Sequence, residues 1–322
     1  MHTMGTKMHL RAIGSLQVSA VGLGCNNFGG RIDERQTASV VAAALDAGIN
    51  FFDTADVYGG TKSEEYLGRA LGRRREDAVI ATKFGSKLDE DRRGAAPAYV
   101  RRALEDSLRR LGTDYIDLYQ LHRPDPETPI ADTLEALADA VAEGKVREIG
   151  CSNFTEAQLR EAEAATREGA PRFVSVQNDY SLLERSPEAG FPSAGVLAEC
   201  ERKGIAFIPY FPLKSGLLSG KYRRGEAAPE GSRLAAIPAD RQEELFSDET
   251  MDTVEALTRY AEKHGHSVLE LAIAWLLAKP AVASVIAGAT KPEQVWANAK
   301  AAAWALATDE VAEVDAIAPP PA

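Results

Sequence analysis

Four polar side chains stand at or just after the ends of short apolar runs in this 322-residue chain: Asp53, Tyr58, Lys83 and His122. A lysine ammonium close to a tyrosine phenol favours the phenolate and lowers the phenol's reference pKa of about 10. A carboxylate beside the lysine keeps the lysine charged, and an imidazole can hydrogen-bond a substrate oxygen. Such a group could protonate a carbonyl oxygen while hydride from a bound cofactor attacks the carbon.

Eight short runs, rich in β-branched or aromatic residues, must position these side chains. They are Ala20–Leu23, Ile49–Phe52, Val79–Thr82, Tyr115–Leu121, Val146–Gly150, Phe173–Gln177, Ile205–Tyr210 and Ser284–Ala287. Their continuous apolar character predicts strands buried on both faces. Amphipathic segments with helical spacing separate them, which predicts parallel strands joined by right-handed helical crossovers.

Eight strand–helix units favour an α/β fold with a closed (β/α)8 TIM barrel over an open doubly wound sheet. The first strand is not followed by Gly-x-Gly-x-x-Gly, which also disfavours an open dinucleotide-binding sheet. In such a barrel the carboxyl ends of the strands share one face, where active sites are built. We therefore expect the four polar side chains to converge there.

Three segments fall outside the repeat, and no interdomain linker is evident, so we expect one domain over residues 1–322. Residues 8–19 predict a β-hairpin that turns at Gly14-Ser15 and closes the barrel floor. Residues 214–247 form a long stretch rich in Gly, Arg and Glu, of a length that is usually functional or disordered. The Pro-rich end, residues 318–322, is expected to fray.

Composition excludes several classes of function. A net charge of −11 argues against general binding to nucleic acid or anionic membrane. The first residues lack the apolar core of a secretory signal, and no run is long enough to span a membrane. Three widely spaced cysteines form neither a disulfide framework nor a metal-ligand pattern. We expect a cytoplasmic protein with no metal and no obligate protein partner.

Seven motifs resemble the aldo-keto reductase family, and they run in the family's order along nearly the whole chain. They are Asp53–Gly59 (DTADVYG), Ala81–Phe84 (ATKF), Gln120–Asp125 (QLHRPD), Gly150–Phe154 (GCSNF), Gln177-Asn178, Tyr210–Leu213 (YFPL) and Ile286–Lys291 (IAGATK). The resemblance implies the same (β/α)8 barrel and reversible hydride transfer between a nicotinamide and an aldehyde or ketone. It makes Tyr58 the general acid, Lys83 the residue that tunes it, Asp53 the partner of Lys83, and His122 the residue that orients the carbonyl.

The same resemblance implies a cofactor site. Ser152, Asn153 and Gln177 match residues that bind the nicotinamide carboxamide, and Tyr210 matches the aromatic residue that stacks on the ring. The loop around the pyrophosphate is matched by Phe211, Pro212, Leu213, Lys214, Gly216 and Lys221. The adenosine end is matched by Gly288, Thr290, Lys291, Gln294 and Asn298, with Lys291 opposite a 2′-phosphate. Cys25, Asn26, Asp53 and Arg233 complete the expected set.

Local charge points to NADPH or NADP+ rather than NADH. Six basic residues fall in the segments matched to the cofactor: Lys214, Lys221, Arg223, Arg224, Arg233 and Lys291. Only the phosphorylated cofactor carries the additional anionic group that such side chains would hold. Phe211 and Lys214 depart from the family's usual small residues, and Lys214 could either contact a phosphate or crowd the loop.

Other interpretations remain open. Asp53 and Lys83 could form a structural ion pair, and Tyr58 or His122 could be packing residues. Within the resemblance, some relatives are potassium-channel β-subunits that bind NADPH mainly as regulators, but they carry asparagine where this chain has His122. A third alternative is a Schiff-base lyase with Lys83 as nucleophile, which would require a neutral lysine. The substrate is open; aromatic or small aliphatic aldehydes and ketones are our expectation.

Overall fold

A computed structural model describes residues 8–188, 195–236, 238 and 245–320. Eight parallel strands form one sheet in the order β10-β3-β4-β5-β6-β7-β8-β9, so strands that follow one another in sequence are paired. Their bounds are β3 (Val21–Gly24), β4 (Phe51–Asp53), β5 (Val79–Phe84), β6 (Ile116–Leu121), β7 (Val146–Ser152), β8 (Phe173–Asp179), β9 (Ala206–Tyr210) and β10 (Val285–Gly288). All eight predicted strands are present.

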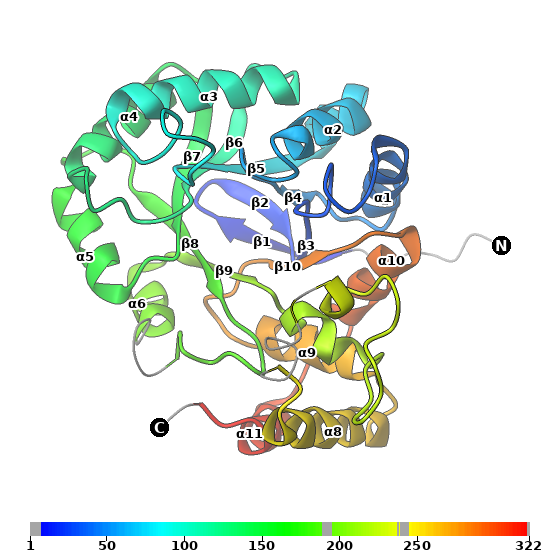
Figure 1. Cartoon of the computed structure of the whole chain (residues 1–322). Coiled ribbons are helices and arrows are strands. Elements are labelled where there is room, and N and C mark those ends of the chain that lie inside the picture. The colour runs from blue at the N-terminus through cyan, green and yellow to red at the C-terminus, as the bar shows by residue number, and fades with distance from the viewer. Residues whose placement is uncertain (1–7, 189–194, 237, 239–244, 321–322) are drawn as a thin grey trace.

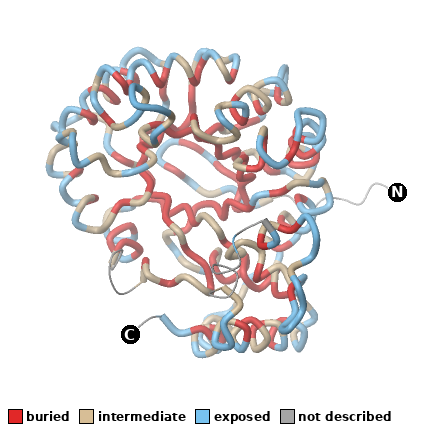
Figure 2. Tube along the Cα trace, viewed as in Figure 1, coloured by how far each residue is buried: buried red, intermediate tan, exposed pale blue. Residues whose placement is uncertain are grey.

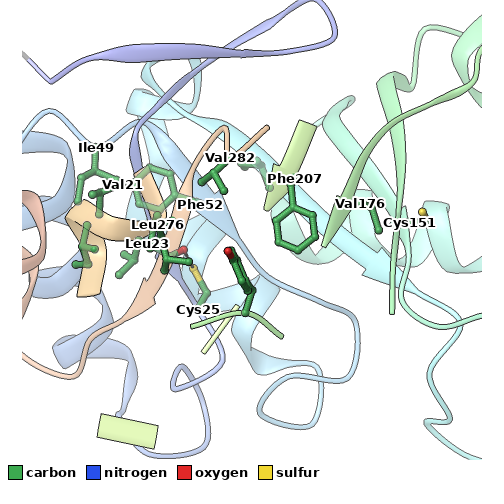
Figure 3. Close-up of a cluster of buried hydrophobic side chains, with 14 of the residues drawn as sticks. Val21, Leu23, Cys25, Ile49, Phe52, Cys151, Val176, Phe207, Leu276 and Val282 are labelled. Atoms are coloured by element: carbon green, nitrogen blue, oxygen red, sulfur yellow. Dashed lines mark hydrogen bonds between the residues drawn. The ribbon is translucent and has the colours of Figure 1, made fainter. Parts of the chain in front are cut away.

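The sheet closes on itself between β9 and the segment before β10. Phe207 bridges Val282 in parallel orientation, and the Phe207 N–H donates to the Ala281 carbonyl at 2.8 Å. The Ala283 N–H donates back to the Phe207 carbonyl at 2.9 Å. Figure 3 shows Phe207 and Val282 among the buried side chains at this closure. The predicted (β/α)8 barrel is confirmed.

Helices surround the barrel (Figure 1). Their bounds are α1 (Glu34–Asp46), α2 (Lys62–Leu71), α3 (Pro97–Leu111), α4 (Ile130–Ala142), α5 (Glu156–Ala165), α6 (Val196–Lys203), α8 (Asp248–Lys263), α9 (Val268–Leu277), α10 (Pro292–Ala301) and α11 (Thr308–Ile317). In the described part of the chain, none of them has the length and apolar character needed to cross a membrane.

Helix α3 illustrates why these segments are helical and how they pack. Pro97 occupies the first turn, where its missing N–H costs nothing, and Gly112 ends the helix in a left-handed conformation. Val100, Leu104 and Leu108 recur at helical spacing and are buried against the barrel. Figure 2 shows the general result, with buried residues along the strands and exposed residues on the outer helix faces.

The N-terminal hairpin closes the floor of the barrel, as predicted. Strands β1 (Leu10–Ile13) and β2 (Leu16–Ser19) pair in antiparallel register. Ile13 and Val18 are fully buried in a cluster with Phe51 and other inward-facing strand residues. Arg11 fastens the hairpin by donating to the carbonyls of Val282 and Leu277 at 2.6 and 2.7 Å.

The long segment after β9 contains two short 3₁₀ helices, η2 (Lys214–Ser219) and η3 (Leu234–Ala236). Residues 237 and 239–244 of the predicted loop lie outside the described residues. At the C-terminus, Ala318 is buried and its carbonyl accepts a hydrogen bond from Arg185. The predicted frayed tail therefore starts too early by at least this residue, while residues 321–322 lie outside the described chain.

Candidate active site

The four polar residues converge at the carboxyl ends of β4, β5 and β6. Lys83 Nζ lies 2.6 Å from Asp53 Oδ1 and 3.4 Å from the Tyr58 hydroxyl. The Tyr58 and His122 rings meet edge to face with centroids 5.8 Å apart. Asp53 is the last residue of β4, Lys83 lies within β5, and His122 directly follows β6. The barrel topology thus joins residues that are far apart in the sequence.

Hydrogen bonds fix the orientation of the Lys83–Asp53 pair. The Lys83 ammonium has a third acceptor in the Thr54 carbonyl at 2.8 Å, so all three of its protons have a partner. The other Asp53 oxygen, Oδ2, accepts from Gln177 at 2.8 Å and from Gln120 at 3.4 Å. Both charged side chains are buried. A buried pair with satisfied hydrogen bonds keeps its charges and one fixed geometry.

Burial and charge act on the pKa values of this group. Burial opposes the charged form of Lys83, but Asp53 and Tyr58 outweigh it and hold the pKa of Lys83 above its usual value. Burial also raises the pKa of Tyr58, and the nearby Lys83 offsets only part of that rise. Lys83 acts in the expected direction, but our expectation that it brings the phenol's pKa below 10 is wrong, because burial outweighs it. Tyr58 is a protonated donor at neutral pH.

His122 is neutral in this environment. Burial, followed by the positive charges of Lys83 and Arg123, lowers the pKa of His122 to about 3. Its Nδ1 atom is buried and has no hydrogen-bond partner among the described residues. A neutral imidazole can direct one ring nitrogen toward a substrate oxygen without competing with Tyr58 as an acid.

Three side chains, those of Lys83, Cys25 and Cys151, lack the properties of a nucleophile. Lys83 is charged and fully paired, which argues against the neutral nucleophile that a Schiff-base lyase requires. Cys25 is fully buried, and burial and Asp53 raise the pKa of its thiol well above the usual value. Cys151 is buried as well, and burial raises its thiol pKa. Neither thiol has the lowered pKa of a nucleophilic cysteine.

A cavity of about 790 Å³ opens at this face of the barrel and is lined by Tyr58, His122 and Asp53. This volume suits a dinucleotide together with a small substrate. Most of the residues expected to bind the cofactor also line it. They are Cys25, Asn26, Ser152, Asn153, Gln177, Tyr210, Phe211, Pro212, Leu213, Gly216, Lys221, Arg233, Gly288, Thr290, Gln294 and Asn298.

A hydrogen-bond chain connects the residues expected at the nicotinamide with the catalytic group. The Tyr210 hydroxyl donates to Asn153 Oδ1 at 2.8 Å, and Asn153 Nδ2 donates to the His122 carbonyl at 2.9 Å. The Ser152 hydroxyl donates to the Gln177 carbonyl at 2.7 Å, and the Gln177 side chain reaches Asp53. Asn153 adopts a left-handed backbone with φ 62°, a conformation that asparagine tolerates. These contacts give the polar wall of the cavity a fixed shape.

Four of the six basic side chains expected around the cofactor do not line the cavity. Lys214 pairs with Asp179 and Glu184, and Arg224 pairs with Asp248, Asp252 and Glu255. Arg223 donates to backbone carbonyls of its own loop, and Lys291 is exposed just before α10. All four residues lie in the segments matched to the cofactor, but sequence position gives the segment and not the direction of the side chain. Contact of Lys214 and Lys291 with a cofactor stays a prediction.

Two arginines that the sequence analysis did not predict are part of the cavity wall. Arg31, in the loop after β3, and Arg123, directly after His122, both line the cavity. Arg31 donates to the Gly231 carbonyl at 2.8 Å, which brings it to the segment that contains Arg233. Burial and the neighbouring Arg31 lower the pKa of Arg233, whose guanidinium lies over the Phe211 ring at 4.7 Å. Arg31 stands in a loop with no motif, so no sequence signal marked it.

The charges of the cavity fit an anionic ligand. Arg31, Lys221 and Arg233 line it, and none of them forms an ion pair with a described acidic residue. Of the acidic lining residues, Asp53 is already paired with Lys83, which leaves Glu293. A protein with a net charge of −11 thus has a cationic cavity. The pyrophosphate of a dinucleotide is an anion that would pair with these groups.

Comparisons with known proteins agree with this geometry. The family model described as "Aldo/keto reductase family" matches residues 20–319. A probable voltage-gated potassium channel subunit beta of Oryza sativa is 35% identical over 89% of this chain and 88% of its own length. The glycerol dehydrogenase AKR11B4 from Gluconobacter oxydans superposes with a TM-score of 0.82 at 31% identity, covering 97% of each chain.

A holo structure of the aldo-keto reductase AKR11C1 from Bacillus halodurans superposes with a TM-score of 0.79 at 32% identity, covering 97% of this chain and 96% of that one. The match of the family model over most of the chain, together with these relatives, settles the assignment. The chain belongs to the aldo/keto reductase family, whose members are oxidoreductases that generally use a nicotinamide cofactor.

Proposed function

We propose that the protein is an NADPH-dependent reductase that converts an aldehyde or ketone to an alcohol, reversibly, in the cytoplasm. The observation that carries the proposal is the Tyr58 hydroxyl, which faces the cavity 3.4 Å from the Lys83 ammonium and beside the neutral His122. A phenol in this position can protonate a carbonyl oxygen, and the ammonium stabilises the phenolate that remains. When bound, the cofactor supplies or accepts the hydride.

Each catalytic residue has a distinct part in this proposal. His122 hydrogen-bonds the carbonyl oxygen and orients it toward Tyr58, and Tyr58 delivers the proton. Lys83 faces the phenol oxygen, and Asp53 holds Lys83 charged and in place. In the direction of alcohol oxidation, the same phenol oxygen takes the proton back. The partner is therefore a small molecule with a carbonyl or hydroxyl group.

Each part of the cofactor has residues to hold it in this proposal. Ser152, Asn153 and Gln177 would bind the carboxamide, and Tyr210 would stack on the nicotinamide ring. Arg31, Lys221 and Arg233 would hold the pyrophosphate, together with the backbone of residues 211–216. The adenosine would lie against Gly288 and Thr290 before α10 and against Gln294 and Asn298 within it, and the exposed Lys291 would extend to a 2′-phosphate. Both cofactors carry the pyrophosphate, so the preference for NADPH over NADH rests on Lys291 and the 2′-phosphate that only NADPH carries.

Turnover with a panel of carbonyl compounds tests the proposal directly. The protein is expected to oxidise NADPH in the presence of aromatic or small aliphatic aldehydes, and to bind NADPH more tightly than NADH. Because one structural relative is a glycerol dehydrogenase, the panel should include small polyols with NADP+. Failure to turn over any of these compounds, with NADPH bound, would contradict the proposal.

A regulatory role is the second candidate, because a relative is named as a probable potassium channel subunit beta. In that case the protein would bind the cofactor with little turnover. His122 distinguishes the two roles, since the resemblance places asparagine at this position in the channel subunits. His122→Asn should reduce turnover and leave NADPH binding intact in a reductase. A regulator would show negligible turnover both before and after the substitution.

A further inference from the structure

The loop that follows β9 has an unusual backbone. Phe211, Lys214 and Ser215 all have positive φ values, 52°, 39° and 56°, although none of them is glycine. A non-glycine residue in this region is strained, and it persists only where the surrounding structure imposes the conformation. Two turn hydrogen bonds support the loop, from the Lys214 N–H to the Phe211 carbonyl and from the Gly216 N–H to the Leu213 carbonyl, both at 2.8 Å.

Lys214 points away from the cavity that its neighbours line. Leu213 and Ser215 both line the cavity, whereas Lys214 does not. Its ammonium lies 3.3 Å from Asp179 Oδ2 and 3.1 Å from Glu184 Oε2. The side chain therefore serves as an attachment to another part of the barrel rather than as a ligand contact.

The attachment joins two strand ends at the active-site face. Asp179 is the last residue of β8 and pairs in register with Tyr210, the last residue of β9. The loop with the strained backbone starts immediately after Tyr210. Glu184 follows β8 in a short bridged turn. Lys214 thus ties the loop after β9 back to the end of the neighbouring strand.

This ion pair is better shielded than an ordinary surface pair. Only 19% of the Lys214 side chain is exposed, against 29% for Asp179 and 32% for Glu184. Asp179 Oδ1 is buried without a hydrogen-bond partner among the described residues, so Lys214 contacts the single satisfied oxygen of that carboxylate. Without Lys214, two nearby carboxylates would repel each other with no cation between them.

We propose that Lys214 is a positioning residue whose ion pair with Asp179 and Glu184 holds residues 211–216 in the strained conformation that retains the dinucleotide. The inference rests on the proposed function, because it takes the cavity to be the cofactor site. The loop supplies one wall of that site through Phe211, Pro212, Leu213, Ser215 and Gly216. Releasing the tether lets Phe211, Lys214 and Ser215 relax to negative φ and opens the wall.

The dissociation rate of NADPH tests this role. In a stopped-flow displacement experiment followed by NADPH fluorescence, Lys214→Met should raise the dissociation rate roughly three- to tenfold, with little change in the association rate. Lys214→Arg should restore most of the wild-type rate. Asp179→Asn should raise the rate in the wild-type background and add little to Lys214→Met.

Lys203→Met provides a matched control. Lys203 forms an ion pair with Glu163 at 2.7 Å, of comparable exposure, between α5 and α6 and away from the cavity. This variant should leave the dissociation rate unchanged. Thermal unfolding of every variant separates retention of the cofactor from general stability.

Two results would overturn the proposal. An unchanged NADPH dissociation rate in Lys214→Met would overturn the positioning role, whether or not the Tm of the variant falls. Failure of the wild-type protein to bind either NADPH or NADH would reject the proposed function, and this inference with it. Tight binding of NADPH with equal dissociation rates in the wild type and in Lys214→Met would reject only the role of Lys214.

Discussion

At the scale of single residues, burial sets the protonation states and charge modulates them. Burial raises the pKa of Tyr58 more than Lys83 lowers it, and burial with two nearby cations brings the pKa of His122 to about 3. The acid of the site is thus protonated and its neighbouring imidazole neutral over the same wide range of pH. Lys83 remains charged because Asp53 and Tyr58 outweigh the cost of burying it.

These protonation states predict a flat pH profile for carbonyl reduction. A lowered pKa means that His122 is neutral everywhere above about pH 4, and a raised pKa means that Tyr58 stays protonated beyond pH 10. The value of kcat/KM should therefore vary little between about pH 5 and about pH 9. Steady-state kinetics across this range check it. A decline at low pH with an apparent pKa near 6.5, absent in His122→Asn, would contradict a neutral histidine.

At the scale of elements, the loop after β4 that carries Tyr58 also contains a buried carboxyl group. Asp56 lies between Asp53 and Tyr58, is almost fully buried, and donates its backbone N–H to the Lys83 carbonyl at 3.1 Å. Its Oδ2 accepts from the Tyr99 hydroxyl of α3 at 3.5 Å, whereas Oδ1 has no partner in the described chain. Burial and Glu64 raise the pKa of Asp56 to about 7, against the opposing effect of Arg110.

Linkage gives the sign of the effect of Asp56 on stability. Because its folded-state pKa lies above the ordinary value of 3.8, folding favours the protonated form. The stabilisation of the folded state by the protonated Asp56 is complete below about pH 4 and is lost as the pH rises through 7. Asp56→Asn, which mimics the neutral carboxyl, should therefore be more stable than wild type at alkaline pH. The difference should be a few kcal/mol at most, because each tenfold change in proton affinity corresponds to about 1.4 kcal/mol.

Chemical denaturation at acidic and alkaline pH measures this difference. The advantage of Asp56→Asn should shrink at acidic pH, where the wild-type carboxyl is protonated as well. Asp106→Asn is a suitable control, because Asp106 forms an i,i+3 surface pair with Arg109. A variant that is destabilised at alkaline pH and matches the wild type at acidic pH would show instead that Asp56 is needed in its ionised form.

At the scale of the whole molecule, the packing that stabilises the barrel floor and the cavity that carries the catalytic group lie at opposite ends of the barrel. The hairpin packs Ile13 and Val18 into the floor, while the cavity opens at the other face. Ile13→Ala should lower the free energy of unfolding by about 2–5 kcal/mol, because it leaves a cavity under the strands. Under conditions where the variant is folded, its affinity for NADPH should match that of the wild type.

Denaturant unfolding and NADPH titration check both parts of this prediction. Leu10→Ala is the matched control, since 51% of Leu10 is exposed and its truncation should change stability by less than about 0.5 kcal/mol. Loss of NADPH affinity in folded Ile13→Ala would mean that the floor and the cofactor site are coupled.

The sequence predicts the barrel well because its signals are local and repeated. Each buried strand is a continuous apolar run, and eight such runs leave few alternative topologies. The catalytic group follows from that topology, since Asp53, Lys83 and His122 lie at strand ends. The sequence does not predict the direction in which a loop side chain points. Lys214 and Ser215 are adjacent, yet one pairs with Asp179 and Glu184 while the other lines the cavity.

Residues without a motif were missed for the same reason. Arg31 reaches the cavity because the loop after β3 meets the segment around Gly231, 200 positions away. No short pattern records such a contact. The pKa of Tyr58 also depended on burial, which the order of residues does not give. Contacts between distant loops and the degree of burial are therefore what the structure adds.

The central claim is that Tyr58 donates the proton to the carbonyl oxygen, and Tyr58→Phe tests it most directly. With any aldehyde that the wild type reduces, the substitution should lower kcat by about 10²–10⁴ while the Kd for NADPH stays the same. Tyr66→Phe on α2 is the control, because Tyr66 does not line the cavity. A Tyr58→Phe enzyme that bound NADPH and kept the wild-type kcat would contradict the account.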